Sequence, residues 1–450
     1  IKIYMKKNSK KSFFSVREII GKSKKFLKDN KRFTISSDPN FFLTSWAKGP
    51  GYLNLKKISG QRNSIFSIVK EDLKLIFNRN YIDKIKIENN FSKKYKNIII
   101  SYFDEKNLKK NKYYDKYFNL WSNELKKTLL ILIPTSKKIL NTKKFNNLLL
   151  LKIKYKNYYL NLISSILIYF YLTIAKFLNK KKYSQYLGNS NFNSKFNNQL
   201  YDIIKNKSVK NVYFPYEAQP HQHSFTLYLK KKLPNIKIFG YMHTVLPALP
   251  VDYIKRDGYP DKIFLNGKLQ KKILYDFLDW KKKDLVAIKS FRYHKNLKEN
   301  FSKKIFLPYD LHNIKLIVKN FENLILNFRP NYFPSLKIRN HPAMKHSTKH
   351  NKLIIELEKK INNYKMLLKS RKNNQNISIF IGSTASVVEC LERNIEVYHI
   401  TENPIFESYN PKIWTTIHVN KIDKNLFSYR LKKKGYIINF GNKKTKLKKL

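Results

Sequence analysis

Two segments in the last third of the sequence combine residue types that can bind a phosphate group. The first is Ile338–Pro342 (Ile-Arg-Asn-His-Pro), where Pro342 ends an apolar run and holds His341 in an extended conformation. A histidine placed there can donate a hydrogen bond to a phosphate or to the oxygen of a leaving group. It can equally be a loop histidine that caps the end of a strand.

The second segment is a short turn between an apolar run that ends at Ile381 and a stretch of helical character. Free N–H groups and the positive end of the dipole favour an anion where a helix begins. An ordinary N-cap needs one hydroxyl, and this turn has three after its glycine. Glu389, further along the helix, is either a ligand of a ribose or a surface carboxylate. The turn consists of Gly382, Ser383, Thr384 and Ser386, with Ala385 between the last two.

A third set of polar residues follows apolar runs in the middle of the chain. Glu217 comes just past one such run and can act as the general base that takes a proton from an acceptor hydroxyl. The alternative is a structural glutamate that binds a loop. Three more residues are expected to line the same cleft: Gln219, Tyr241 and His243.

Apolar runs and helical stretches alternate along most of the chain, which predicts parallel sheets covered by helices. Two such series predict an α/β protein of two Rossmann-like, doubly wound domains that face a cleft. Ligands then bind beyond the carboxyl ends of the strands. One helical stretch is expected at 117–125. The runs lie at 97–101, 129–133, 211–214, 236–240, 261–265 and 285–288, and then at 304–308, 335–339, 365–368, 377–381 and 396–400.

These patterns predict the division of the chain. We expect residues 1–92 to form an N-terminal extension or accessory unit, 93–300 the first Rossmann-like domain, and 301–450 the second. The apolar stretch Tyr159–Lys176 is diluted by polar residues, so it is either a membrane span or a helix that is buried or touches a membrane.

The composition narrows the classes of partner. The formal net charge is +62, but the lysines are spread over the whole chain together with many Asn and Ile, a combination that A/T-rich codons explain. No nucleic-acid-binding motif appears, so we expect no nucleic-acid partner and instead an anionic membrane surface. The single cysteine, Cys390, excludes an intramolecular disulfide and is expected as a buried thiol. His221 and His223 diverge if they begin a helix, so no metal site is predicted.

The His-Pro segment and the Gly-Ser-Thr-Ala-Ser turn, in this order and spacing, resemble the C-terminal domain of bacterial surface-polysaccharide glycosyltransferases of the sialyl-, polysialyl- and Kdo-transferase-like families. Residues 213–293 are similar to surface-carbohydrate (capsule, O-antigen, lipopolysaccharide) biosynthesis proteins with Tyr-Glu-x-Gln-Pro, Gly-Tyr-x-His and Pro-Asp…Asn-Gly segments. The acidic motif that holds the base in sialyl- and polysialyltransferases is incomplete here, at Asp257-Gly258. The resemblance implies a GT-B fold, with 93–300 as the acceptor domain and 301–450 as the nucleotide-sugar donor domain. It also implies contacts to the donor from His341, Pro342, Gly382, Ser383, Thr384, Ser386 and Glu389.

The sequence thus predicts an inverting, metal-independent glycosyltransferase that moves a sugar from a nucleotide-sugar, such as a CMP-sugar, to a surface polysaccharide or lipid-linked glycan. The nucleotide-sugar is its substrate, and no cofactor is expected. Glu217 and His341 are the candidate catalytic residues. We expect a cytoplasmic protein, peripheral on the inner membrane face. A nucleotide-sugar epimerase, a polyol-phosphate transferase and a non-catalytic glycan-assembly partner at the membrane remain alternatives.

Overall fold

The structure is a computed structural model of the chain. It describes residues 15–29, 50–61, 80–82, 95–109, 112–134, 147–151, 153–155, 170, 190–205, 208–294, 301–328, 336–365, 376–442, 445 and 447. Apart from Phe170, the stretch Tyr159–Lys176 lies outside these residues. Within them, no helix combines the length and the apolar character that crossing a membrane requires.

The first large sheet has seven strands, all parallel, in the order β12-β11-β10-β9-β2-β6-β7. The chain leaves β2 toward one edge and later continues from β9 toward the other edge, so the direction of winding switches between these two strands. The bounds are β2 Asn97–Phe103, β6 Thr128–Pro134, β7 Leu148–Leu150, β9 Asn211–Pro215, β10 Lys237–Tyr241, β11 Lys262–Leu265 and β12 Leu285–Ala287.

The second large sheet has six strands in the order β14-β13-β15-β16-β18-β17. Its first four strands are parallel, while β18 runs antiparallel to both of its neighbours. Here the winding switches between β13 and β15. The bounds are β13 Lys304–Phe306, β14 Lys337–Arg339, β15 Ile377–Ile381, β16 Glu396–Ile400, β17 Ile417–Asp423 and β18 Leu426–Leu431.

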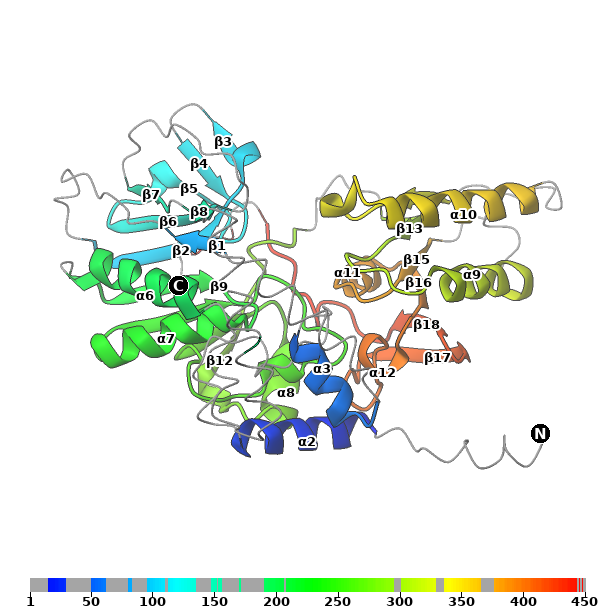
Figure 1. Ribbon diagram of the computed structural model, residues 1–450, viewed down its shortest axis with the longest axis horizontal. Helices are drawn as coiled ribbons and strands as arrows, with labels where there is room; N and C mark the ends of the chain where they lie inside the picture. The colour runs from blue at the N-terminus through cyan, green and yellow to red at the C-terminus, as the bar shows by residue number, and fades with distance from the viewer. Residues whose placement is uncertain are drawn as a thin grey trace.

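Helices pack on both sheets and form two separate halves of the molecule (Figure 1). The parallel strands read as continuous apolar runs because they are buried on both faces; all five residues of β15 are buried. The predicted α/β class with two Rossmann-like domains is therefore confirmed. The helices are α6 Ser190–Lys205, α7 Pro220–Lys232 and α8 Lys268–Phe277 in the first half, and α9 Ile314–Phe328, α10 Thr348–Lys365, α11 Ser386–Glu392 and α12 Pro404–Glu407 in the second.

The helix expected at 117–125 is wrong. This segment belongs to a small antiparallel sheet of β3 (Leu108–Lys109), β4 (Lys112–Asp115) and β5 (Leu120–Trp121). The buried carboxylate of Asp115 accepts the backbone N–H groups of Tyr117 and Phe118 at 2.9 and 2.8 Å, which closes a turn instead of a helix. The turn inserts Phe118 into the core on one face of the first sheet.

The N-terminal helices α2 (Val16–Asp29) and α3 (Pro50–Ile58) lie between the two halves (Figure 1). In α2, Lys24 forms a 2.6 Å ion pair with Asp279, just beyond α8. In α3, the ring of Tyr52 packs edge-on against Phe406 of α12 at 5.3 Å. Residues expected as an extension thus contact both domains. Further along, β1 (Asn80–Ile82) pairs with β8 (Ile153–Tyr155).

The C-terminal residues return to the first domain. The carbonyl of Tyr436 accepts the N–H of Leu269 at 2.9 Å, and Asn439 donates its N–H to the carbonyl of Asn266 at 2.6 Å. The carboxylate of Glu392, at the end of α11, accepts N–H groups from the same returning segment. The predicted division of the chain assigned all of 301–450 to the second domain and did not include this return.

Candidate functional site

A cleft of about 840 Å³ opens between the two large sheets. Residues that come directly after parallel strands line both of its walls, as expected where carboxyl ends of strands meet. The cleft lies where the direction of winding switches in each sheet, between β2 and β9 in the first and between β13 and β15 in the second. On the first wall, Glu217 follows β9, Thr244 follows β10 and Arg292 follows β12; on the second, Pro308, His341, Gly382 and Glu402 follow β13, β14, β15 and β16.

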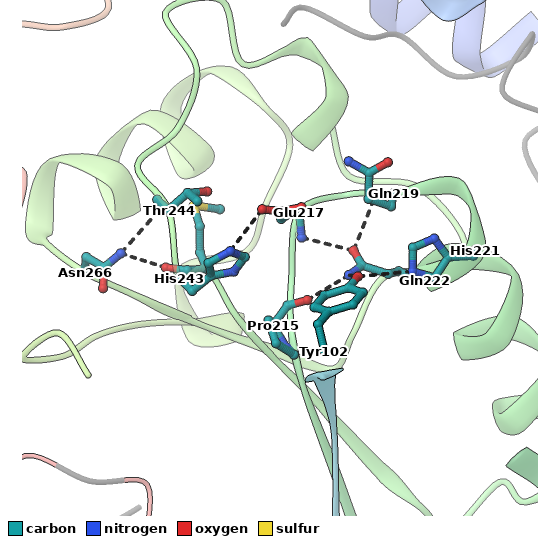
Figure 2. A network of polar contacts seen from close by, with 10 residues as sticks. Tyr102, Pro215, Glu217, Gln219, His221, Gln222, His243, Thr244 and Asn266 are labelled. Carbon is teal, nitrogen blue, oxygen red and sulfur yellow. Dashed lines mark hydrogen bonds and ion pairs between the residues drawn. The ribbon is translucent and has the colours of Figure 1, made fainter. Parts of the chain in front are cut away.

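Glu217 and His243 form a pair on the first wall (Figure 2). Nε2 of His243 lies 3.0 Å from Oε1 of Glu217, and the two side chains are 4% and 31% exposed, so the carboxylate faces the cleft and the imidazole stands behind it. Burial raises the pKa of Glu217, but His243 and then Arg292 lower it below its ordinary value. Burial lowers the pKa of His243 more than Glu217 raises it. The pair is therefore a carboxylate that accepts an N–H from a neutral imidazole.

A buried glutamine holds the loop that carries Glu217. Oε1 of Gln222 accepts the backbone N–H groups of Glu217 and Gln219 at 3.0 and 3.1 Å. Its Nε2 donates to the carbonyl of Pro215 at 2.7 Å (Figure 2). These bonds fix the exit of β9, including Ala218 with its positive φ of 55°. The position of the carboxylate is thus set before any ligand binds.

His341 lines the second wall, where the ring of Tyr309 packs edge-on against it at 5.4 Å between centroids. Partial burial, together with nearby His350, holds the pKa of His341 below its ordinary value. His341 is therefore neutral at neutral pH and can donate one N–H to a phosphate oxygen. Pro342 begins a 3₁₀ turn, Pro342–Met344, and is exposed outside the cleft lining. It shapes the loop and does not contact the cleft.

The turn at Gly382 has a left-handed backbone, with φ at +64°. A Cβ atom here would lie 3.1 Å from two side-chain carbons of Pro308 on the adjacent strand exit. The carbonyl of Gly382 accepts a hydrogen bond from Nε2 of buried His399 at 2.7 Å. The backbone N–H of Gly382 donates to the carbonyl of Ile400 at 2.8 Å. Neighbouring strands thereby hold the turn rigidly against the cleft.

The hydroxyl residues of this turn line the cleft together: Ser383, Thr384 and Ser386. The N-cap of α11 is Ala385, whose side chain has no hydroxyl, so none of these residues stands at the N-cap position itself. Oγ1 of Thr384 accepts the N–H of Ser386 at 3.3 Å. Glu389, one turn into the helix, reaches the same cleft but is also paired with Arg393 at 2.9 Å.

Three residues expected at the cleft lie elsewhere. Tyr241 is buried, and its hydroxyl donates to Oδ1 of Asn266 at 2.8 Å, so it supports the sheet instead of lining the cleft. Gln219 caps α7 and is absent from the described lining. His243, also expected at the surface of the cleft, lies behind Glu217. Tyr241 is the last residue of β10, and both it and His243 are buried, whereas Thr244 reaches the cleft.

Sequence reasoning missed several cleft residues. Arg292 follows β12, and Glu402 follows β16, so the strand-end rule alone signalled both positions. Glu402 accepts the backbone N–H of His312 at 2.8 Å and also bonds the N–H of Asn313, which fixes the start of α9. Among the described residues that line the cleft, the charged ones are Glu217, Asp310, Glu389, Glu402, Glu407 and Arg292.

His221 and His223 begin α7, as their spacing indicated, and both side chains point into separate packing environments. The ring of His223 packs against Tyr259 at 4.4 Å, whereas Nε2 of His221 lies 3.3 Å from the hydroxyl of Tyr102. In the described part of the chain, no group of three or more His, Cys, Asp or Glu residues is arranged to hold a metal ion. Cys390 is buried, as expected of an inert core thiol.

No protein-family model matches the chain, and no curated protein matches its sequence. Similar solved structures include the N-terminal domain of Candida albicans trehalose-6-phosphate phosphatase, at 10% identity and a TM-score of 0.35, covering 74% of this chain and 91% of that one. A glycosyltransferase from Rickettsia africae has 12% identity and a TM-score of 0.32, over 70% and 86% of the two chains. A UDP-forming α,α-trehalose-phosphate synthase from Burkholderia vietnamiensis has 10% identity and a TM-score of 0.33, over 63% and 77%.

Proposed function

We propose that the chain is a glycosyltransferase that moves a sugar from a nucleotide-sugar to a surface polysaccharide or a lipid-linked glycan. The observation that carries this proposal is the composition of the two walls. One wall presents the ionised Glu217, and the other presents His341 with the hydroxyls of the Gly382 turn. A base opposite an anion-binding wall is the arrangement that a group transfer from a phosphate leaving group requires.

The reaction we propose is a single displacement with inversion. The acceptor hydroxyl lies against Glu217, which takes its proton while the hydroxyl oxygen attacks the anomeric carbon. The bond from that carbon to the phosphate oxygen breaks, and the electron pair leaves with the nucleotide. His341 and the hydroxyls of Ser383 and Ser386 donate hydrogen bonds to the phosphate as its charge grows. The closed cleft keeps water from competing with the acceptor.

The charges in the cleft favour a donor with a single phosphate. The described lining holds five carboxylates, one guanidinium and no lysine, in a chain with 92 lysine and arginine residues. At the phosphate itself, a diphosphate donor brings more negative charge than the single phosphodiester of a CMP-sugar. Because buried like charges repel strongly, the monophosphate is the better fit.

The first experiment is a thermal-shift screen of CMP, UDP and GDP. A nucleotide at a hundredfold its dissociation constant stabilises the protein by about 2.7 kcal/mol, and we expect CMP to do so most. No stabilisation by any nucleotide contradicts the proposal and favours a non-catalytic assembly partner. With donor alone, isomerisation of the sugar indicates an epimerase. Release of CMP from a CMP-polyol on transfer indicates a polyol-phosphate transferase.

The second experiment tests the donor wall. His341→Ala and Ser383→Ala are each expected to lower turnover by more than about tenfold, because each removes a hydrogen bond to the leaving group. Matched controls are His346→Ala, an exposed histidine beyond the 3₁₀ turn, and Ser428→Ala, a half-buried serine on β18 away from the cleft. Near-normal transfer by both cleft variants contradicts this assignment of the donor wall.

We further propose that the protein acts in the cytoplasm, peripherally at the inner membrane face. The support is the exposed basic side of α2, with Arg17, Lys22, Lys25 and Lys28, in a chain of net charge +62. Such a surface is attracted to anionic lipids, and salt screens the attraction. Sedimentation with anionic vesicles that high salt reverses is the expected result, and equal sedimentation with neutral vesicles contradicts it.

A further inference from the structure

Among the described residues that line the cleft, Arg292 is the one lysine or arginine. It lines the cleft and is exposed to it. No hydrogen bond or ion pair joins its guanidinium to another residue that the structure describes. The guanidinium lies over the ring of Tyr293, with Cζ 5.6 Å from the ring centroid. By contrast, Arg393 is paired with Glu389 and Arg430 with Glu396. The guanidinium N–H groups of Arg292 can thus bind a ligand in the cleft.

Buried hydroxyls fix the backbone at this position. The N–H of Arg292 donates to the hydroxyl of Tyr241 at 3.3 Å and to Oγ of Ser290 at 3.2 Å. The N–H of Tyr293 also donates to Oγ of Ser290, at 2.8 Å. Both hydroxyl groups belong to buried residues. The exit of β12 is therefore rigid, and the guanidinium is presented to the cleft from a preorganised position.

Arg292 lies on the same wall as Glu217. Burial raises the pKa of Glu217, and His243 and then Arg292 lower it, so the guanidinium is within electrostatic reach of the carboxylate. In an in-line displacement the nucleophile and its base stand opposite the leaving group. A cation beside the base is therefore on the side of the acceptor, away from the donor phosphate.

We propose that Arg292 binds an anionic group, a carboxylate or a phosphate, on the acceptor glycan, and so selects a charged acceptor over a neutral one. This inference rests on the proposed function and specifies the acceptor side of the same site. A guanidinium binds either group through two parallel hydrogen bonds. Because Arg292 is the one lysine or arginine among the described cleft residues, an anionic group bound to it gives the acceptor one orientation on the first wall.

The test uses two matched pairs of sugars: methyl glucuronide against methyl glucoside, and glucose 6-phosphate against glucose. Binding of each to the full chain is measured by calorimetry, with and without saturating CMP. For at least one pair, we expect the charged member to bind about tenfold or more tightly, as one charge-assisted interaction provides. A preference in the first pair identifies a carboxylate, and a preference in the second identifies a phosphate.

Variants separate Arg292 from the donor site. In Arg292→Gln the preference should fall to within about twofold, while Arg292→Lys should retain part of it, because it keeps the charge but loses the paired hydrogen bonds. Arg430→Gln, on the exposed side of β18, is the control and should keep the full preference. The affinity for CMP should be the same in all of these variants.

Two results overturn the inference. One is equal binding of the charged and neutral members of both pairs by the wild type. The other is a tenfold loss of CMP affinity in Arg292→Gln with the preference among sugars intact, which assigns Arg292 to the donor phosphate. Failure of CMP, UDP and GDP to bind the wild type contradicts the proposed function instead, and the sugar measurements without nucleotide still decide the role of Arg292.

Discussion

Nε2 of His243 lies 3.0 Å from Oε1 of Glu217, and the imidazole is almost fully buried behind the carboxylate. The edge of its ring contacts that of Tyr117 at 4.6 Å between centroids, which holds the imidazole in place. Glu217 therefore has a fixed donor on one side and the cleft on the other. Such a pair keeps a carboxylate ionised in a site that burial would otherwise make unfavourable for charge.

Replacing Glu217 with Gln should lower transfer by about a hundredfold or more, since a general base typically contributes that much. Binding of the nucleotide should be unchanged, because Glu217 stands on the opposite wall. Turnover and a nucleotide titration measured on the same preparation check both expectations. Turnover within about threefold of wild type removes Glu217 from the reaction.

His243 should set the pH range of the reaction. The donated N–H stabilises the ionised form of Glu217, so His243→Phe should raise the pKa of that carboxyl. The base is then protonated earlier on acidification, and the acid side of the profile of kcat against pH moves to higher pH. His243→Gln, which can still donate an N–H, should move it less. If the pH profiles of both variants are the same as that of the wild type, this role of His243 is contradicted.

Gly382→Ala should destabilise the second domain and weaken nucleotide binding. A left-handed backbone costs a residue with a Cβ about 1–2 kcal/mol. The new Cβ would in addition lie 3.1 Å from the ring of Pro308, which must then shift. Gly435→Ala is the matched control, since Gly435 has φ at +69° with nothing within 4 Å of the added atom. Equal loss of stability in both, with normal nucleotide affinity, contradicts the role of this contact.

The sequence was sufficient for most of the parallel strands, but not for β7, β17 and β18, nor for every side chain of the site. Strands such as β15 were predictable because residues buried on both faces form an apolar run, and the strand-end rule then brought Glu217, His341 and the Gly382 turn to one cleft. The inward position of Tyr241 was not predictable, because a slip of one residue at a strand exit reverses the face.

Long-range contacts were beyond the sequence as well. The short segment after β12 matches no motif, and β12 is the edge strand, separated from β9 by β11 and β10, so the lining of the same cleft by Arg292 and Glu217 depends on the path of the chain after β12. In the same way, the contacts of α2 and α3 with both domains depend on partners such as Asp279 and Phe406, hundreds of residues away. Local periodicity contains no information on such pairs.

His399 should make the protein sensitive to acid. Burial lowers its pKa to about 4, with the bond to the carbonyl of Gly382 opposing the shift. The ordinary value is near 6.5, so between these values the unfolded chain binds more protons than the folded one. Stability is therefore complete above pH ~6.5 and falls on acidification toward pH ~4, by on the order of 3 kcal/mol for this residue.

The midpoint of urea unfolding against pH measures this effect. His399→Gln should flatten the fall between pH ~6.5 and ~4, because one proton fewer is taken up on unfolding. His418→Gln, at an exposed position on β17, is the control and should leave the slope unchanged. An unaltered slope in His399→Gln shows that other groups, such as half-buried His221, account for any acid sensitivity.

Glu392 should hold the returning C-terminal segment on the first domain. Its buried carboxylate accepts N–H groups from Gly435, Ile437 and Ile438, at 2.5, 2.9 and 3.0 Å. In Glu392→Gln the amide nitrogen faces at least one of these donors, so stability should fall by about 1–3 kcal/mol.

Hydrogen exchange is the direct measurement of this attachment, because the amides of residues 435–438 should exchange faster in Glu392→Gln than in the wild type. Glu396→Gln is the control: its partner Arg430 is exposed, and such surface pairs contribute about 1 kcal/mol or less. Since α11 begins at Ser386 in the cleft and ends at Glu392, a bound nucleotide should slow exchange at 435–438 in the wild type. Exchange that responds neither to the substitution nor to the nucleotide contradicts a connection through this helix.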